Sequence, residues 1–244
     1  MLKIARFMET VSDIRALPVL ADDQIHIWGL HVPEMAGRME ALHARLSEQE
    51  QAKAARFRRA ADRQSSVSAR GALRILLSGY TGIAAQEITF QYAENGKPHV
   101  ADLAVDFNVS HSGDWVVLAF GRGRNIGVDV EKIKRELDVE AIAARFFSAA
   151  ETALIQAAAD KHTVFFQLWA RKEAYVKARG SGLFRGLSHF TVPIENGALP
   201  EMGESDGWIF QRLEAGTKYA SAVVTDKMLG GVPCYDFGGL KWDS

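Results

Sequence analysis

One stretch of this chain, Thr163 to Gly182 (TVFFQLWARKEAYVKARGSG), limits its possible folds more than any other. It consists mostly of helix-forming residues, and Gly180 is suited to the left-handed conformation that ends many helices. Residues four apart lie one turn apart on the same face of a helix, as Glu173 and Lys177 do here. The stretch therefore predicts a long helix that presents a carboxylate and an ammonium group side by side.

Two faces of this predicted helix differ in character. Phe166 and Trp169 share the face of Glu173 and Lys177, although a solvated helix face seldom carries large aromatic side chains. An isolated pair of this kind is most often a solvated salt bridge, so the aromatic neighbours are what favours a site. A second face is expected to pack into the core through Phe165, Leu168, Tyr175 and Val176.

The rest of the chain alternates blocks of helical and strand pattern. Ser47 and Glu50 form a possible capping box that begins a helix to about Arg59, and Asp62 is expected to cap a helix that runs to Leu77 and stops at Gly79. The other expected helices span 139–146, 149–159 and 163–179. The expected strands span 24–32, 87–92, 105–109, 115–120, 125–130, 189–194, 208–213 and 219–225, with an Asn-Gly turn within 94–98. Short Gly- and Ser-rich connections between the middle strands indicate antiparallel pairing.

This order of elements predicts an α+β fold of two similar halves, each a small, mainly antiparallel sheet with packed helices. The expected division is an N-terminal arm over 1–23, a first half over 24–124, a second half over 125–226 and an irregular tail over 227–244.

Composition excludes several classes of protein. A net charge of −1 argues against a nucleic-acid binder, and no apolar run approaches the length of a membrane span. The single cysteine, Cys234, fits a reducing compartment, and the first residues lack the apolar core of a signal peptide. We therefore expect a cytoplasmic protein, monomeric, without nucleic-acid or membrane partners.

A local excess of positive charge contrasts with this neutrality. Seven cations stand against Asp62 alone between positions 53 and 74: Lys53, Arg56, Arg58, Arg59, Arg63, Arg70 and Arg74. They form either an ordinary solvated face or a patch that receives phosphates or an acidic partner.

Three places could carry chemistry. Ser110-His111-Ser112 suits a phosphate or polar ligand better than hydrolysis, because neighbours on a strand point to opposite faces and cannot form a nucleophile–base pair. Asp129 and Glu131 are two apart on an apolar strand, so both carboxylates project from one face. If Glu173 faces them, three carboxylates converge with the oxygen ligands that Mg²⁺ prefers, and Mg²⁺ is commonly shared with substrate phosphates.

These residues together resemble the Sfp-type 4'-phosphopantetheinyl transferases. The matching motifs are ENGKP (94–98), FNVSHS (107–112), IGVDVEKI (126–133), RFFSAAE (145–151) and LWARKEAYVKARGSGL (168–183). The likeness runs from about Ser47 to Val192. It implies two similar halves related by a pseudo-twofold axis, with coenzyme A in the cleft between them, and transfer of phosphopantetheine to a serine of an apo acyl or peptidyl carrier protein with release of 3',5'-ADP.

The resemblance also implies roles for individual residues. Asp129, Glu131 and Glu173 would bind Mg²⁺, or Mn²⁺ in its place, against the coenzyme A diphosphate. Glu173, or a water held by Glu131, would take the serine proton, and Lys177 would neutralise or protonate the leaving group. The coenzyme's phosphates would be held by Lys97, Ser110 and His111, and its 3'-phosphate region by Lys53 and Ser66.

One position departs from the family pattern. Where members usually offer two basic residues at the nucleotide-binding helix start, this chain has Glu50 followed by Lys53. The departure should weaken the hold on the 3'-phosphate unless Arg56 or a basic residue of the N-terminal arm substitutes. Two other functions stay open from the sequence: a protein that binds carrier proteins or coenzyme A without catalysis, and a magnesium-dependent hydrolase of coenzyme A or another diphosphate.

A last expectation concerns Lys172, which the helical wheel places on the core side of the long helix. A lysine there must either extend its ammonium to water or pair with an acid, and Glu151 at the start of the preceding helix is the candidate acid. We expect this pair to set the angle at which the long helix presents Glu173.

Overall fold

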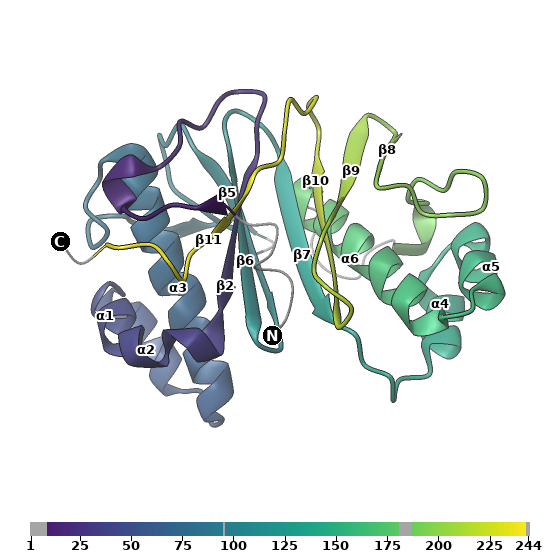
Figure 1. Cartoon of the computed structure of the whole chain (residues 1–244), viewed down its shortest axis with the longest axis horizontal. Helices are drawn as coiled ribbons and strands as arrows, with labels where there is room; N and C mark the ends of the chain where they lie inside the picture. Colours follow the sequence, from purple (N-terminus) through teal and green to yellow (C-terminus); the bar gives the residue numbers. More distant parts are fainter. Residues whose placement is uncertain (1–8, 95, 181–186, 243–244) are drawn as a thin grey trace.

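The computed structural model describes residues 9–94, 96–180 and 187–242. It has an α+β fold of two halves, each a sheet with its helices packed on one face (Figure 1), as the sequence predicts. The helices are α1 (Met39–Ala44), α2 (Glu48–Ala55), α3 (Ala60–Thr81), α4 (Val139–Phe146), α5 (Ala149–Ala157) and α6 (Lys161–Arg179). Among the described residues, no helix combines the length and the apolar character needed to cross a bilayer.

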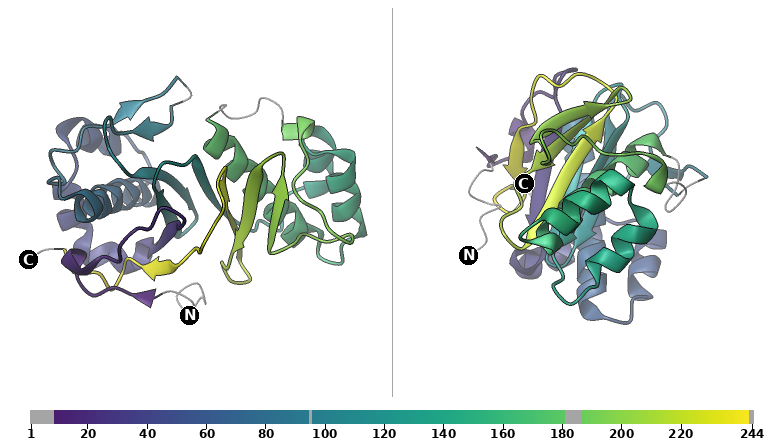
Figure 2. Two further views of the ribbon diagram at one scale, coloured as in Figure 1. Left: turned by 90° about the horizontal axis from the view of Figure 1, so that it is seen from above. Right: turned by 90° about the vertical axis from the view of Figure 1, so that its right-hand side faces the viewer.

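Two larger sheets and one hairpin contain the strands. The first sheet has the order β1 (Glu9–Thr10), β11 (Cys234–Asp236), β2 (His26–His31), β6 (Trp115–Gly121), β5 (Asp106–Ser112). The second has the order β7 (Ile126–Lys132), β10 (Tyr219–Thr225), β9 (Trp208–Leu213), β8 (Met202–Ser205). The hairpin of β3 (Gln91–Tyr92) and β4 (Pro98–His99) stands away from both sheets (Figure 2).

Alternation along the strands divides the interior into three cores. Trp28, Leu118 and Phe120 face the helices of the first half, and Phe210 and Ala222 face those of the second. A third core lies between the sheets, with residues that include Ile27, Val117, Ala119, Val128, Val130 and Val223. Strand β6 is buried on both faces for this reason, which explains its unbroken apolar sequence.

Several expected boundaries were wrong. The helix α3 begins after Arg59 rather than at Asp62 and passes through Gly79, where a Cβ would lie 2.6 Å from the side chains of Ile14 and Leu17. Gly79 is therefore a packing residue, and Gly82, at a φ of 75°, ends the helix. The first capping box is confirmed, but α2 stops at Ala55.

Two strands were misplaced, and the short strands β1, β4 and β11 were missed. Residues 189–194 form no strand, and β8 supplies the fourth strand of the second sheet instead. Of the expected strand 87–92, only β3 forms. The tail is not wholly irregular, because β11 runs parallel to β1 and β2 and places the chain's end in the first sheet. Asn95 of the expected turn, residues 1–8 of the arm and 243–244 of the tail lie outside the described residues.

Candidate active site

A close approach of α6 to β7 creates the site. A Cβ at position 127 would lie 1.8 Å from the carbonyl oxygen of Ala174 and 2.5 Å from the nitrogen of Ala178, so only glycine permits this contact. Asp129 follows Gly127 on the same face of β7 and so lies beside the turn that carries Glu173 and Lys177. Gly127 is thus a site-forming residue, although sequence reasoning gave it no role.

Lys177 and Asp129 form an ion pair at this contact. The Lys177 ammonium lies 2.7 Å from Asp129 Oδ1 and also donates to Ser110 Oγ at 2.9 Å and to the Val128 carbonyl at 3.1 Å. Because the Asp129 side chain is only 5% exposed, this pair neutralises a buried charge. Ser110, expected at the coenzyme's phosphates, here contacts the carboxylate.

Glu173 is buried in the same region and carries a perturbed pKa. Its pKa is raised to about 7, mainly by burial and also by the charges of Asp129 and Glu131, while Lys177 opposes the rise. Burial and the Asp129 charge also raise the pKa of Glu131, while a hydrogen bond from Ser112 opposes that rise. The three carboxylates therefore lie within electrostatic range of one another.

Two buried oxygens at this place have no hydrogen-bond partner among the described residues: Asp129 Oδ2 and Glu173 Oε1. Orphaned buried carboxylate oxygens fit a hard cation, which takes oxygen ligands. In the described residues, however, no three acidic, histidine or cysteine side chains are already gathered as a metal site. Convergence of all three carboxylates on one ion remains a prediction.

A groove of about 600 Å³ lies on the first half next to this region. Its lining includes Lys53 from α2, Ser66 from α3 and His111 from β5, so the structure brings these three predicted coenzyme contacts together. Strand alternation turns the exposed His111 to the groove and its neighbours Ser110 and Ser112 to the other face of β5.

Lys97 lies elsewhere. Its ammonium donates to the carbonyls of Ile126 and Lys177, each at 3.0 Å, and so connects the β3–β4 segment to β7 and to the last turn of α6. Burial lowers the pKa of Lys97. A cation at the carboxyl end of a helix is favourable, and this contact joins the two halves. Lys97 itself is not among the residues that line the groove, although its neighbour Pro98 is.

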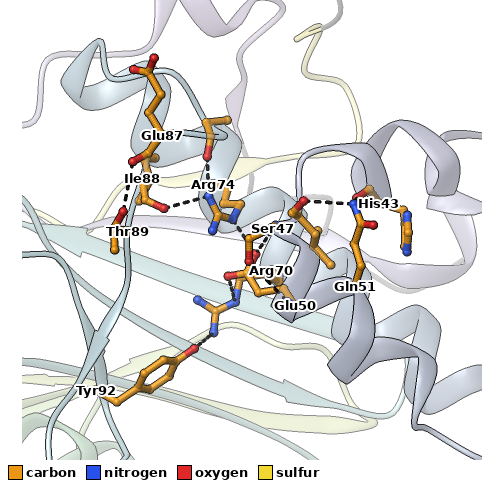
Figure 3. A network of polar contacts seen from close by, with 12 residues as sticks. His43, Ser47, Glu50, Gln51, Arg70, Arg74, Glu87, Ile88, Thr89 and Tyr92 are labelled. Carbon is orange, nitrogen blue, oxygen red and sulfur yellow. Dashed lines mark hydrogen bonds and ion pairs between the residues drawn. The ribbon is translucent and has the colours of Figure 1, made fainter.

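Glu50 is the centre of an internal network, shown in Figure 3. Its carboxylate accepts from the Ser47 amide at 2.9 Å and pairs with Arg74 at 2.7 Å and Arg70 at 3.5 Å. Arg74 is buried and donates to the carbonyls of Ala85 and Ile88. Glu50 therefore has a structural role: it pairs with two of the expected surface cations, of which Arg74 is buried and Arg70 still lines the groove.

Two aromatic residues that favoured a site have a different role. Trp169 is stacked on Phe165, with ring centroids 5.7 Å apart, and also contacts Phe147 at 6.0 Å. Phe166 is buried in the same core. The sequence thus located the site on the correct helix, but these aromatic side chains pack the second half rather than line the site.

The expected pair of Lys172 and Glu151 is confirmed. The ammonium lies 2.9 Å from Glu151 Oε2, and both side chains are 0% exposed. Lys172 also donates to the carbonyls of Leu187 at 2.6 Å and Phe190 at 2.7 Å, while Glu151 accepts from the amides of Ser148 and Val192. The pair joins α5, α6 and the segment that follows residue 186.

Comparison with known proteins matches both halves. Residues 33–122 match the family model described as "4'-phosphopantetheinyl transferase, N-terminal", and residues 125–225 match "4'-phosphopantetheinyl transferase superfamily". The 4'-phosphopantetheinyl transferase HetI of Nostoc sp. is 35% identical over 170 residues, covering 67% of this chain and 72% of the relative. The 4'-phosphopantetheinyl transferase Sfp of Bacillus subtilis is 34% identical over 173 residues, covering 69% and 76%. The chain therefore belongs to the Sfp-type 4'-phosphopantetheinyl transferases, enzymes that transfer phosphopantetheine to carrier proteins.

Proposed function

We propose that this enzyme transfers the phosphopantetheine of coenzyme A to a serine of an apo acyl or peptidyl carrier protein in a magnesium-dependent reaction at the contact of β7 with α6. The observation that supports this most is a pair of buried oxygens, one of Asp129 and one of Glu173, that have no hydrogen-bond partner among the described residues and lie in the region of the Lys177 ammonium. Asp129, Glu131 and Glu173 would hold Mg²⁺, or Mn²⁺ in its place. Such an ion supplies charge neutralisation at the diphosphate.

The residues of the chain would then divide the work. Glu173, whose carboxylate is buried beside Asp129 and Lys177, would take the proton of the carrier serine as general base. A water held by Glu131 is the other candidate base. The serine oxygen forms a bond to the phosphorus next to pantetheine, the bridging P–O bond breaks, and 3',5'-ADP leaves with its charge balanced by Lys177. The groove with Lys53, Ser66 and His111 would hold the nucleotide end.

Intact-mass measurement of a panel of apo carriers tests this function. With coenzyme A and Mg²⁺, at least one carrier should gain one phosphopantetheine mass, and EDTA should prevent the gain. Release of 3',5'-ADP without any gain in carrier mass would support hydrolysis instead, and binding with neither product would support a non-catalytic role.

The rate should also depend on salt. Five exposed cations flank the groove around the α2–α3 turn: Lys53, Arg56, Arg58, Arg59 and Arg63. If they attract the phosphates of coenzyme A or an acidic carrier, kcat/KM should fall as salt rises, because the screening length shortens from about 10 Å at 0.1 M to about 3 Å at 1 M.

Removing charges tests whether the salt dependence comes from this cationic surface or from general screening of the whole protein. Replacing Arg58 and Arg59 with glutamine should flatten the salt dependence, whereas removing two other exposed cations, with Lys218→Gln and Lys241→Gln, should leave it steep. Equal slopes in the two double variants would mean that the cationic turn is only a solvated face.

A further inference from the structure

Three alternate residues of β5 carry short polar side chains toward β7. The amide of Val128 donates to Asn108 Oδ1 at 2.9 Å, that of Val130 to Ser110 Oγ at 3.4 Å, and that of Lys132 to Ser112 Oγ at 3.1 Å. Both partners advance by two residues, so the strands run in parallel, and side-chain oxygens replace the carbonyls of an ordinary ladder. The row fixes the register of one half against the other.

The two hydroxyls of this row also reach the carboxylates of β7. Ser110 donates to Asp129 Oδ1 at 2.7 Å, and Ser112 donates to Glu131 Oε2 at 2.9 Å. A hydroxyl that accepts from an amide still has its own proton to donate, so each serine joins a backbone position to the neighbouring carboxylate. The backbone amide of β7 fixes the position of the serine oxygen, and the hydroxyl proton of that serine then points to the carboxylate.

The two carboxylates differ in how many groups hold them. Asp129 Oδ1 contacts Lys177 as well as Ser110, at 2.7 Å in both cases. Within the described part of the chain, Ser112 provides the only hydrogen bond to the Glu131 carboxylate, and this side chain is half-buried at the end of the strand. A glutamate in that position has three rotatable bonds, so this one bond decides where its carboxylate lies.

We propose that Ser112 is a positioning residue, by which the first half holds the Glu131 carboxylate of the second half in its working orientation. This inference rests on the proposed metal site. Loss of the hydroxyl would leave both the Lys132 amide and Glu131 without their partner, and the carboxylate would turn to water. Sequence reasoning included Ser112 in a possible ligand-binding tripeptide but assigned individual roles only to Ser110 and His111, although the alternation of Asn108, Ser110 and Ser112 is visible in the sequence.

Mn²⁺ titration in the presence of coenzyme A, followed by electron paramagnetic resonance, tests the inference. Ser112→Ala should weaken Mn²⁺ binding by about tenfold, as loss of a group that orients a metal ligand does. Ser112→Thr keeps the hydroxyl and should restore most of the affinity. The matched control is Ser205→Ala on β8. It removes a hydroxyl that donates to the Thr191 carbonyl, and it should leave the affinity unchanged.

Hydrogen exchange of the metal-free protein gives a second measurement. The Lys132 amide should exchange faster in Ser112→Ala than in the parent or in Ser112→Thr, because only the alanine variant removes its acceptor. If Ser112→Ala binds Mn²⁺ as tightly as the parent, or if Ser112→Thr binds as weakly as Ser112→Ala, the positioning role is wrong. A parent protein without Mn²⁺ affinity would instead overturn the proposed metal site, and the inference with it.

Discussion

Replacing Lys172 with methionine should lower the free energy of unfolding by about 3–5 kcal/mol, the typical cost of leaving one member of a buried ion pair without its partner. Methionine fills a similar volume, so the loss of stability reports the missing ammonium group rather than a cavity. The expected cost is at the high end because the ammonium donates to Glu151 and to two carbonyls, and both charged side chains are 0% exposed.

The same substitution should reduce transfer activity without touching substrate. Lys172 connects α6 to the carbonyls of Leu187 and Phe190, so its loss frees the helix that carries Glu173. We expect kcat to fall, because the Glu173 carboxylate that would take the proton is no longer held in place.

Chemical denaturation checks the stability effect. The control is Lys161→Met, which removes an ammonium that pairs with Glu140 at 2.9 Å with side chains 38% and 47% exposed. That surface pair should be worth less than about 1 kcal/mol. A double variant, Lys172→Met with Glu151→Gln, should recover part of the loss, since it removes the unpaired buried charge while the glutamine oxygen can still accept from the Ser148 and Val192 amides. Equal losses for the two lysine variants would contradict the prediction.

Features that depend on neighbours in the sequence were predictable. The helical wheel placed Lys172 on the buried side of α6, and the need for a counter-charge led to Glu151, which the structure confirms. The spacing of Asp129 and Glu131, and that of Glu173 and Lys177, likewise followed from the periods of strand and helix. The pairing of Lys177 with Asp129 could not be predicted in this way, because it depends on how closely α6 approaches Gly127.

Features that depend on distant parts of the chain were not predictable. Strand β11 is three residues long, and it is a strand because it lies between β1 and β2, more than 200 residues away in the sequence. From the sequence, Glu50 is interpreted as the loss of a phosphate contact. Its role becomes clear only from the structure, which places Arg70 and Arg74 beside it. Trp169 shares a helix face with Glu173, yet packing against Phe147 and Phe165 decides its role.

Glu173→Gln should have two separable effects, and the first is on catalysis. Loss of the base, and of one oxygen ligand, should reduce the rate of transfer by about 10²- to 10⁴-fold. Asp129 is a poorer choice for this test, because its carboxylate also contacts Lys177 and Ser110, and its removal would take the counter-charge from the half-buried Lys177 ammonium. The control is Glu204→Gln, which changes an exposed carboxylate on β8.

The second effect is on the stability of the metal-free protein. Burial, together with the charges of Asp129 and Glu131, raises the pKa of Glu173 from 4.5 to about 7, so the folded protein binds this proton more tightly than the unfolded chain does. Between those two values the free energy of unfolding must fall as pH rises, and above about pH 7 the whole penalty of about 3 kcal/mol for burying the charge is present.

Glutamine carries no such charge. Glu173→Gln should therefore raise the stability of the metal-free protein at pH 8, by up to that amount, and leave it nearly unchanged below about pH 4.5. Urea denaturation in EDTA at a series of pH values measures the difference. A gain that does not depend on pH would show that the Glu173 pKa is not raised, and a fully active variant would remove Glu173 from the reaction.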